Sequence, residues 1–248
     1  MQAPTPHPTA APFGKIPQSL AYQQVFSAIE KAIESGRLAI GDTLPAEADL
    51  AEQFGVNRST VREGLRLLEH ASLVRRDGKR LVIALPRYLD LAARASRALA
   101  MHRVTFMELW EASMTIEPLI ASLAAQRVTT AQLAAFDRNL AQMEESIDDI
   151  ERVLELDVAF HNLLAEAAGN RALILAREPI GLLFRPAGEV ILPRLKTQHR
   201  ILAAHRFVAD QLKQHDVEGA RAWMHRHMAD FKRGYEATGM NPNEPLDP

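Results

Sequence analysis

The feature that most constrains the fold is a fixed order of local signals early in the chain. A short helical pattern begins at Pro45 and stops at Gly55, and a second one follows Asn57, which can cap it. Two short helices three residues apart are typical of a helix-turn-helix. Asp77-Gly78 then separates two further segments and favours a two-stranded hairpin with a type I′ turn. With a helical pattern over residues 19–35 in front, this order predicts a winged helix-turn-helix.

The charge of this segment favours nucleic acid as a partner. The whole chain has a formal net charge of −2, yet residues 55–83 hold 7 basic and 3 acidic side chains. The start of the second helix of such a motif reads base edges, and flanking groups hold phosphates. The candidate DNA-binding residues are Arg58, Ser59, Thr60, Arg62, Lys79 and Arg80. Taken singly, a basic helix is more often a solvated face, so the prediction depends on the order of the elements.

From residue 86 onward the patterns are helical only. The predicted helices are 87–101, 105–127, 129–146, 148–168, 170–191, 194–214 and 217–236. Pro179 and Pro186 are expected to kink or split the fifth of these. The predicted fold is therefore mostly α, with a small β wing. The predicted regions are a disordered tail at 1–14, a DNA-binding domain at 15–85, an all-helical domain at 86–238 and a disordered tail at 239–248.

Composition excludes several classes of protein and site. No apolar run approaches the roughly 20 residues of a bilayer-spanning helix. The first 14 residues hold four prolines and no Lys or Arg, unlike a signal peptide, so a cytoplasmic protein without a membrane partner is expected. The chain has no cysteine, so a metal would have to be held by His, Asp or Glu.

Four residues form a candidate metal site. Asp157 and His161 are four apart on one predicted helix and can point to one spot, while His205 and His227 lie on the last two helices. One carboxylate and three imidazoles suit Zn²⁺ best, with Ni²⁺ or Mn²⁺ as alternatives. The spacing alone is weak evidence, because any one of these histidines is more often a surface or hydrogen-bonded residue. A metal-free polar pocket is the competing interpretation.

The run GDTLPAEADLAEQFGVNRSTVREGLRLLEHASLVRRDGK resembles the N-terminal domain of the GntR family of bacterial regulators, over about residues 21–85. The resemblance implies that residues at the positions of Arg58, Thr60 and Arg62 contact operator DNA. Two positions depart from the family pattern. Ala48 stands where an arginine is usual, and Arg80 stands where the wing usually has a second glycine.

The later motifs LWEASMTIEP, LELDVAFHNLLAEAAGN and AHRFVADQLKQHDVEGARAWMHRHM look like the FCD effector domain of the FadR-type subfamily. The resemblance implies a metal held at Asp157, His161, His205 and His227, whereas His199, His215 and His225 are expected to face solvent. Ser113 stands where the subfamily often has an arginine, four residues before Glu117. A carboxylate effector would lose that anchor, and Arg185 is a candidate substitute.

The sequence as a whole predicts a transcription regulator that binds double-stranded operator DNA as a homodimer under the control of a small-molecule effector, a small organic acid. No catalytic residue is predicted. The main alternative is a hydrolase or lyase that uses the Asp/His centre. Four protein ligands leave a metal less open than the usual three of catalytic zinc, which disfavours that alternative. A DNA-binding architectural protein without a ligand would leave the histidines unexplained.

Overall fold

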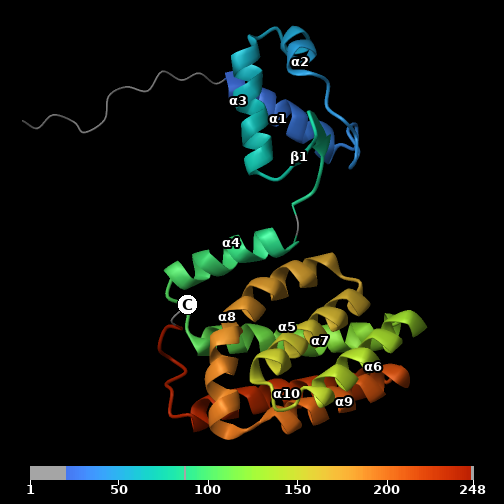
Figure 1. Cartoon of the computed structure of the whole chain (residues 1–248), viewed down its shortest axis with the longest axis vertical. Coiled ribbons are helices and arrows are strands. Elements are labelled where there is room, and N and C mark those ends of the chain that lie inside the picture. The colour runs from blue at the N-terminus through green and yellow to red at the C-terminus, as the bar shows by residue number, and fades with distance from the viewer. Residues whose placement is uncertain (1–20, 87, 247–248) are drawn as a thin grey trace, which may run out of the picture. The chain divides into compact units, whose positions relative to one another are not determined.

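The computed structural model describes residues 21–86 and 88–246, and the chain divides into two compact units, residues 1–87 and 88–248 (Figure 1). The first is a helix-turn-helix with a two-stranded wing and the second is a helical bundle, so the predicted fold class is confirmed. None of the described helices is long and apolar enough to cross a membrane. The expected disordered tail at 1–14 lies outside the described residues.

The first unit contains three helices and one hairpin among its described residues, α1 (Ala21–Glu34), α2 (Glu47–Phe54), α3 (Arg58–His70), β1 (Val74–Asp77) and β2 (Arg80–Ile83). Its core is formed by apolar side chains from all five elements, including Val25, Leu50, Leu65, Val74 and Ile83. Gly64 allows α3 to lie directly against α1, because a Cβ there would lie 2.8 Å from Val25 Cγ1. The core therefore fixes α3 relative to α1.

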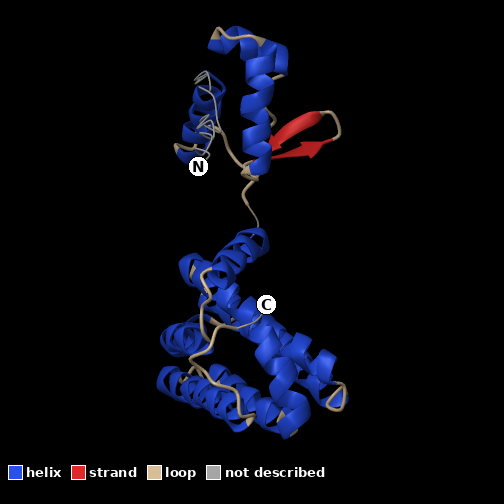
Figure 2. Ribbon diagram, turned by 90° about the vertical axis from the view of Figure 1, so that its left-hand side faces the viewer, coloured by secondary structure: helices blue, strands red, loops and turns tan. Residues whose placement is uncertain are grey.

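The predicted cap of α3 is confirmed. Gly55 ends α2 in the left-handed conformation at φ 64°, and the Asn57 side chain accepts a hydrogen bond from the Thr60 backbone N–H at 2.8 Å. The hairpin differs from the prediction by one residue. Asp77 pairs with Arg80, so the turn residues are Gly78 and Lys79 (Figure 2). Gly78 has φ 60° and Lys79 does not have a positive φ, which fits a type II′ turn rather than type I′.

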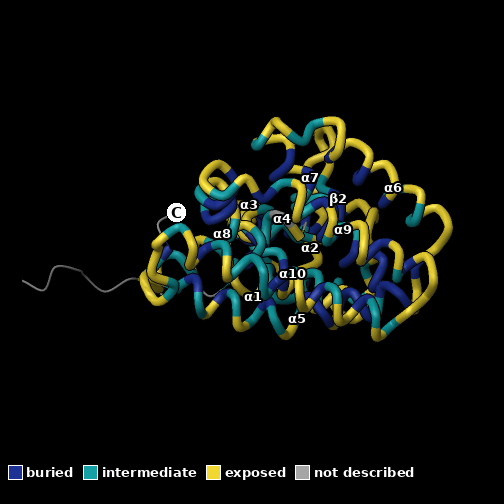
Figure 3. The backbone as a smooth tube through the Cα atoms, turned by 90° about the horizontal axis from the view of Figure 1, so that it is seen from below, coloured by how far each residue is buried: buried dark blue, intermediate teal, exposed yellow. Residues whose placement is uncertain are grey.

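The second unit is helical throughout its named elements, α4 (Tyr88–Met101), α5 (Phe106–Arg127), α6 (Thr130–Glu145), α7 (Ile150–Ala168), α8 (Arg171–Leu195), α9 (Gln198–Lys213) and α10 (Val217–Ala237). Its core contains fully buried Phe106, Phe136, Phe160 and Leu164, and buried positions of the chain are dark blue in Figure 3. α5 packs against α10 and α7, and α9 packs against α10. These four helices enclose the candidate site.

The prediction for the proline-rich helix is partly wrong. α8 is one helix that continues through Pro179, Pro186 and Pro193 to Leu195, although its direction changes along its length (Figure 1). A proline inside a helix removes one backbone hydrogen bond and favours a bend. The helix is nevertheless held in the core by buried side chains between the prolines, including Ile180 and Ile191. The next helix starts at Gln198 rather than at residue 194.

The expectation of a disordered tail from residue 239 is wrong for residues 239–246. Met107 N donates to Pro242 O at 2.8 Å, and Leu246 N donates to Val104 O at 3.1 Å. Leu246 is only 9% exposed and belongs to the core of this unit. Although proline cannot donate a backbone hydrogen bond, its carbonyl can accept one, so this segment lies along the start of α5.

Candidate metal centre and DNA-binding surface

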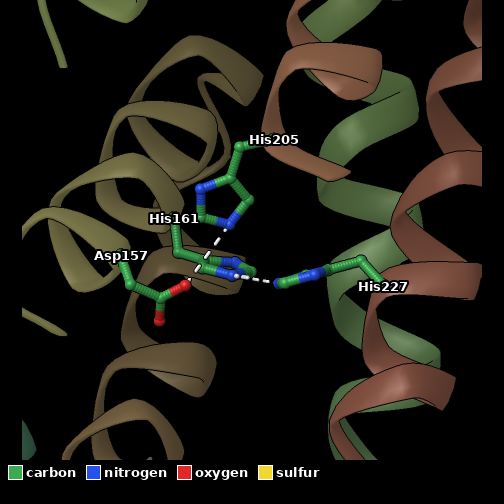
Figure 4. A group of neighbouring side chains, drawn as sticks. All are labelled: Asp157, His161, His205 and His227. Carbon is green, nitrogen blue, oxygen red and sulfur yellow. Dashed lines mark hydrogen bonds and ion pairs between the residues drawn. The ribbon is translucent and has the colours of Figure 1, made fainter. Parts of the chain in front are cut away.

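The bundle brings together the four predicted metal-binding residues. Asp157 and His161 lie one turn apart on α7, and His205 from α9 and His227 from α10 point toward them (Figure 4). Their candidate ligand atoms all lie within 4.8 Å of one another, so the cluster is consistent with a metal site. His161 Nε2 lies 3.3 Å from His227 Nε2, and His205 Nε2 lies 3.3 Å from Asp157 Oδ1. Two ligands at 2.1 Å from a tetrahedral Zn²⁺ are about 3.4 Å apart.

His205 provides a second indication that the cluster fits a cation. Its side chain is 0% exposed, and neither ring nitrogen has a hydrogen-bond partner among the described residues, because the 3.3 Å approach to Asp157 lacks hydrogen-bond geometry. Phe160 stacks on the ring with centroids 3.9 Å apart and an angle of 5° between the planes. A buried polar atom without a partner is costly. Coordination of one nitrogen would relieve part of that cost while Phe160 holds the ring in place.

Glu117 from α5 orients His161, one member of the cluster. Its Oε2 lies 3.0 Å from His161 Nδ1, and its Oε1 accepts a hydrogen bond from Arg177 Nε at 2.9 Å. All three side chains are buried. With Nδ1–H donated to the carboxylate, the lone pair of His161 Nε2 is left to face the other ligand atoms. A carboxylate behind a metal-binding histidine has this orienting role in metalloproteins.

The pKa values of Glu117 and His161 are coupled by this contact. Burial alone would raise the pKa of Glu117, but the charges of His161 and Arg177 and their hydrogen bonds outweigh it and lower that pKa to about 2. Burial alone would lower the pKa of His161, but the charge and hydrogen bond of Glu117, together with Asp157, raise it. Glu117 is therefore ionised at neutral pH, and a cation at the cluster would compete with a proton on His161.

The other members of the cluster are shifted by burial. Burial, helped by the neighbouring charge of His161, lowers the pKa of His227 to about 3. The pKa of His205 is lowered well below its usual range, first by burial and then by His227 and His161. Burial also raises the pKa of Asp157. His205 and His227 are consequently neutral at pH 7, the form in which imidazole binds a metal.

A cavity of about 110 Å³ adjoins the cluster. It is lined by Asp157, His161 and His227, by Glu117 and Arg177, and by an apolar wall that includes Phe184, Ile191, Leu192, Ile201, Met228 and Phe231. Trp110 lies behind this wall, and its Nε1–H donates to Met228 O at 2.9 Å. The chain's second tryptophan, Trp223, stacks instead on Phe207.

Two arginines of α8 differ in their surroundings. Arg185, the predicted substitute anchor, lines the cavity but is 43% exposed, and its Nε donates to Glu189 Oε1 at 3.0 Å. Arg177 is buried and was missed by sequence reasoning. Its partner Glu117 is 60 positions away and on another helix, so no local pattern marks the pair. Ser113, where the resemblance implies an arginine, is buried.

The predicted DNA-binding residues lie in α3 and at the hairpin. Arg58, Ser59 and Arg62 are exposed and Thr60 is half-buried, while Lys79 and Arg80 are exposed at the wing. The hydroxyls of Ser59 and Thr60 each donate to Asn57 Oδ1 at 2.7 Å.

Arg62 has a partner that the sequence did not reveal. Its side chain is 53% exposed, and its Nη2 lies 2.8 Å from Oε2 of Glu47 at the start of α2. Two residues 15 positions apart on different helices give no periodic signal. Because the pair is exposed, its contribution to stability is small, and the guanidinium can exchange the carboxylate for another anion.

Comparison with known proteins gives the same division of the chain. Residues 21–82 match the family described as bacterial regulatory proteins, gntR family, and residues 108–230 match the FCD domain. The HTH-type transcriptional regulator Rv0494 of Mycobacterium tuberculosis is 33% identical over 66% of this chain and 65% of its own length. The HTH-type transcriptional repressor NanR of Salmonella schwarzengrund is 24% identical over 88% of this chain and 85% of its own.

A solved structure supports the same assignment. Streptococcus agalactiae GntR matches with a TM-score of 0.61 and 26% identity, over 86% of this chain and 99% of that one. The matched families consist of transcription regulators rather than enzymes. Taken with the winged motif and the helical bundle behind it, these matches show that the chain belongs to the GntR family of bacterial regulatory proteins and carries a C-terminal FCD domain.

Proposed function

We propose that this regulator binds a palindromic operator as a homodimer and that a small organic acid in the FCD cavity controls the binding. The observation that carries the proposal is the pairing, in one chain, of an exposed basic recognition helix with a cavity that borders a buried Asp/His cluster. A protein of this kind acts where the operator is, in the cytoplasm. In this proposal the winged helix-turn-helix domain binds DNA, and the FCD domain binds the acid.

The metal of this proposal is held by Asp157, His161, His205 and His227. Three neutral imidazoles and one carboxylate form a borderline ligand set that suits Zn²⁺ first, and Ni²⁺ or Mn²⁺ second. A bound divalent ion that accepts a fifth ligand would supply a positive charge able to take one carboxylate oxygen of the effector. Glu117 keeps His161 oriented and accepts its Nδ1–H, and Phe160 keeps the plane of His205 fixed.

In the proposed DNA complex Arg58 and Arg62 reach base edges, Ser59 and Thr60 sit at the groove, and Lys79 and Arg80 contact phosphates. The support is that α3 begins at Arg58, so these side chains lie in its first turns. Arg62 has to leave Glu47 to reach DNA. Since the ion pair is exposed, replacing Glu47 by DNA as the partner of Arg62 costs little free energy. This replacement does not by itself favour one DNA sequence over another.

The salt dependence of DNA binding tests the wing. Lys79→Ala and Arg80→Ala are each expected to reduce the slope of log affinity against log salt by about 1, because each lost phosphate contact releases one fewer counterion. The measurement is fluorescence anisotropy of a labelled operator, selected from random double-stranded DNA, at several salt concentrations. Lys31→Ala, an exposed lysine on α1, is the matched control and should keep the wild-type slope.

Equal slopes in both wing variants and the wild type would show that the wing does not touch phosphate. Failure of the wild type to select any operator from the random pool would instead reject the proposed function. Analytical ultracentrifugation of the protein–operator complex gives its mass, which shows whether two chains bind one operator.

A further inference from the structure

Two buried side chains on the wall of the FCD cavity, Arg177 and Thr197, each keep one polar atom that makes no hydrogen bond to the described residues. We propose that Arg177 and Thr197 bind the organic effector, and that the effector is a small carboxylic acid with a second hydrogen-bonding group, such as a hydroxy acid. Arg177 takes the carboxylate and Thr197 takes the second group. The inference rests on the proposed function, because it names the ligand contacts of the same cavity.

Arg177 is held in the cavity wall by hydrogen bonds from two of its three guanidinium nitrogens. Nε donates to Glu117 Oε1 at 2.9 Å, and Nη1 donates to Asn162 Oδ1 at 2.6 Å. Nη2 makes no hydrogen bond to any described residue, and the atom nearest to a Cβ built at Gly181, another residue of the cavity wall, is this Nη2, at 3.7 Å. The side chain is thus held rigidly with donor capacity left over. A fixed guanidinium at a cavity is suited to a carboxylate.

Thr197 has a polar side chain at a helix-capping position but does not use it to cap the helix. It occupies the N-cap position of α9, but its side chain makes no hydrogen bond to the helix. The residue is 7% exposed and lines the cavity, and its buried Oγ1 has no hydrogen-bond partner in the part of the chain that the structure describes. A threonine at this position ordinarily accepts from the first turn. Because a hydroxyl both donates and accepts, Oγ1 can pair with a hydroxyl or a carbonyl of a ligand.

The size and surface of the cavity limit the ligand. A cavity of 150 Å³ holds benzene without being filled by it, so about 110 Å³ limits the ligand to a molecule of about the size of benzene. The rest of the lining includes the apolar side chains of Phe184, Ile191 and Phe231. A short aliphatic acid with one further polar group offers a partner to each polar residue and apolar surface to the rest of the lining. Glu117 joins Arg177 to His161, so a ligand on Arg177 also contacts the network that orients the metal cluster.

The test uses zinc-loaded full-length protein and calorimetric titration. The probes are butyrate, its 2-, 3- and 4-hydroxy derivatives, and butyramide as the neutral analogue. Wild type is expected to bind at least one hydroxybutyrate more tightly than butyrate, and to bind butyramide about tenfold or more weakly than butyrate.

Two conservative variants separate the roles of the two residues. Arg177→Lys keeps the charge but cannot hold Glu117 and the ligand at once, so affinity for all the acids should fall about tenfold or more. Thr197→Val keeps the shape, so it should weaken the preferred hydroxybutyrate about three- to tenfold and change butyrate less than about twofold. Arg171→Lys, an exposed arginine at the start of α8 outside the cavity, is the matched control.

Zinc content, operator affinity without ligand and the melting temperature are measured on every variant. These should match wild type in Thr197→Val, which therefore tests the inference even if Arg177→Lys is unstable. Binding of no probe to wild type, unchanged affinities in both variants, or a loss seen in Arg185→Lys instead of Arg177→Lys would each overturn the inference. Absence of zinc or operator binding in wild type would reject the proposed function itself.

Discussion

Replacing Arg58 and Arg62 together by alanine is expected to lower operator affinity roughly 30-fold or more, because each base-reading contact contributes about 1–3 kcal/mol. Both side chains are exposed, and alanine is the best helix former, so the fold should survive the change. The measurement is anisotropy of the selected operator at one fixed salt concentration. Thermal unfolding followed by circular dichroism checks that the domain remains folded.

A matched control separates base reading from general charge. Arg37→Ala removes an equally exposed arginine of the first unit that lies outside α3, and it should change affinity less than about threefold. The assignment of the recognition helix fails if the double variant binds the operator as tightly as wild type, or if Arg37→Ala causes the same loss.

Alanine at His205 or His227 is expected to eliminate stoichiometric zinc, because each change removes one of four ligands from a buried cluster. The measurement is elemental analysis of protein prepared without a histidine tag and incubated with Zn²⁺, Ni²⁺ or Mn²⁺. His225→Ala is the matched control, since His225 lies on the same helix as His227 but is exposed. Wild type that carries no more metal than the two cluster variants would remove the metal from the mechanism.

The same site should release its metal in acid. The raised pKa of His161 means that, without metal, this imidazole holds a proton at a higher pH than an ordinary histidine. His205 and His227, with lowered pKa values, stay neutral to lower pH. Metal affinity should therefore fall about tenfold per pH unit below the pKa of His161, as one proton competes for one ligand. Titration of the metal at several pH values gives this slope, and a pH-independent affinity would contradict the assigned role of His161.

Local signals in the sequence were sufficient where the structure depends on neighbouring residues. The Asn57 cap, the Gly55 stop and the four-residue spacing of Asp157 and His161 all act within one or two helical turns, and each has the predicted place. His205 and His227 are on other helices. Their inclusion depended on the family resemblance, because spacing along the chain does not say which helices meet.

The remaining parts depend on packing between distant segments. No pattern pairs Glu117 with Arg177, and Thr197 looks like an ordinary cap until its side chain is located. Tertiary burial also overrode composition in two places. The prolines of α8 predicted a kink or a split, and the helix changes direction but stays continuous, while the proline-rich segment before Leu246 lies against α5 instead of remaining disordered.

The position of Trp110 gives the protein an internal optical reporter. Its indole N–H is bonded to the carbonyl of Met228, which follows His227 directly and lines the cavity. Indole emission depends on the field and polarity around the ring, so a shift of α10 on ligation would be recorded at this residue. Trp223 lies on α10 itself and stacks on Phe207 of α9, so a Trp223→Phe variant is used to leave the emission of Trp110 alone. Tryptophan fluorescence of the unlabelled chain can therefore report ligand binding to the FCD domain. Anisotropy of labelled DNA reports operator binding by the winged helix-turn-helix domain in the same sample.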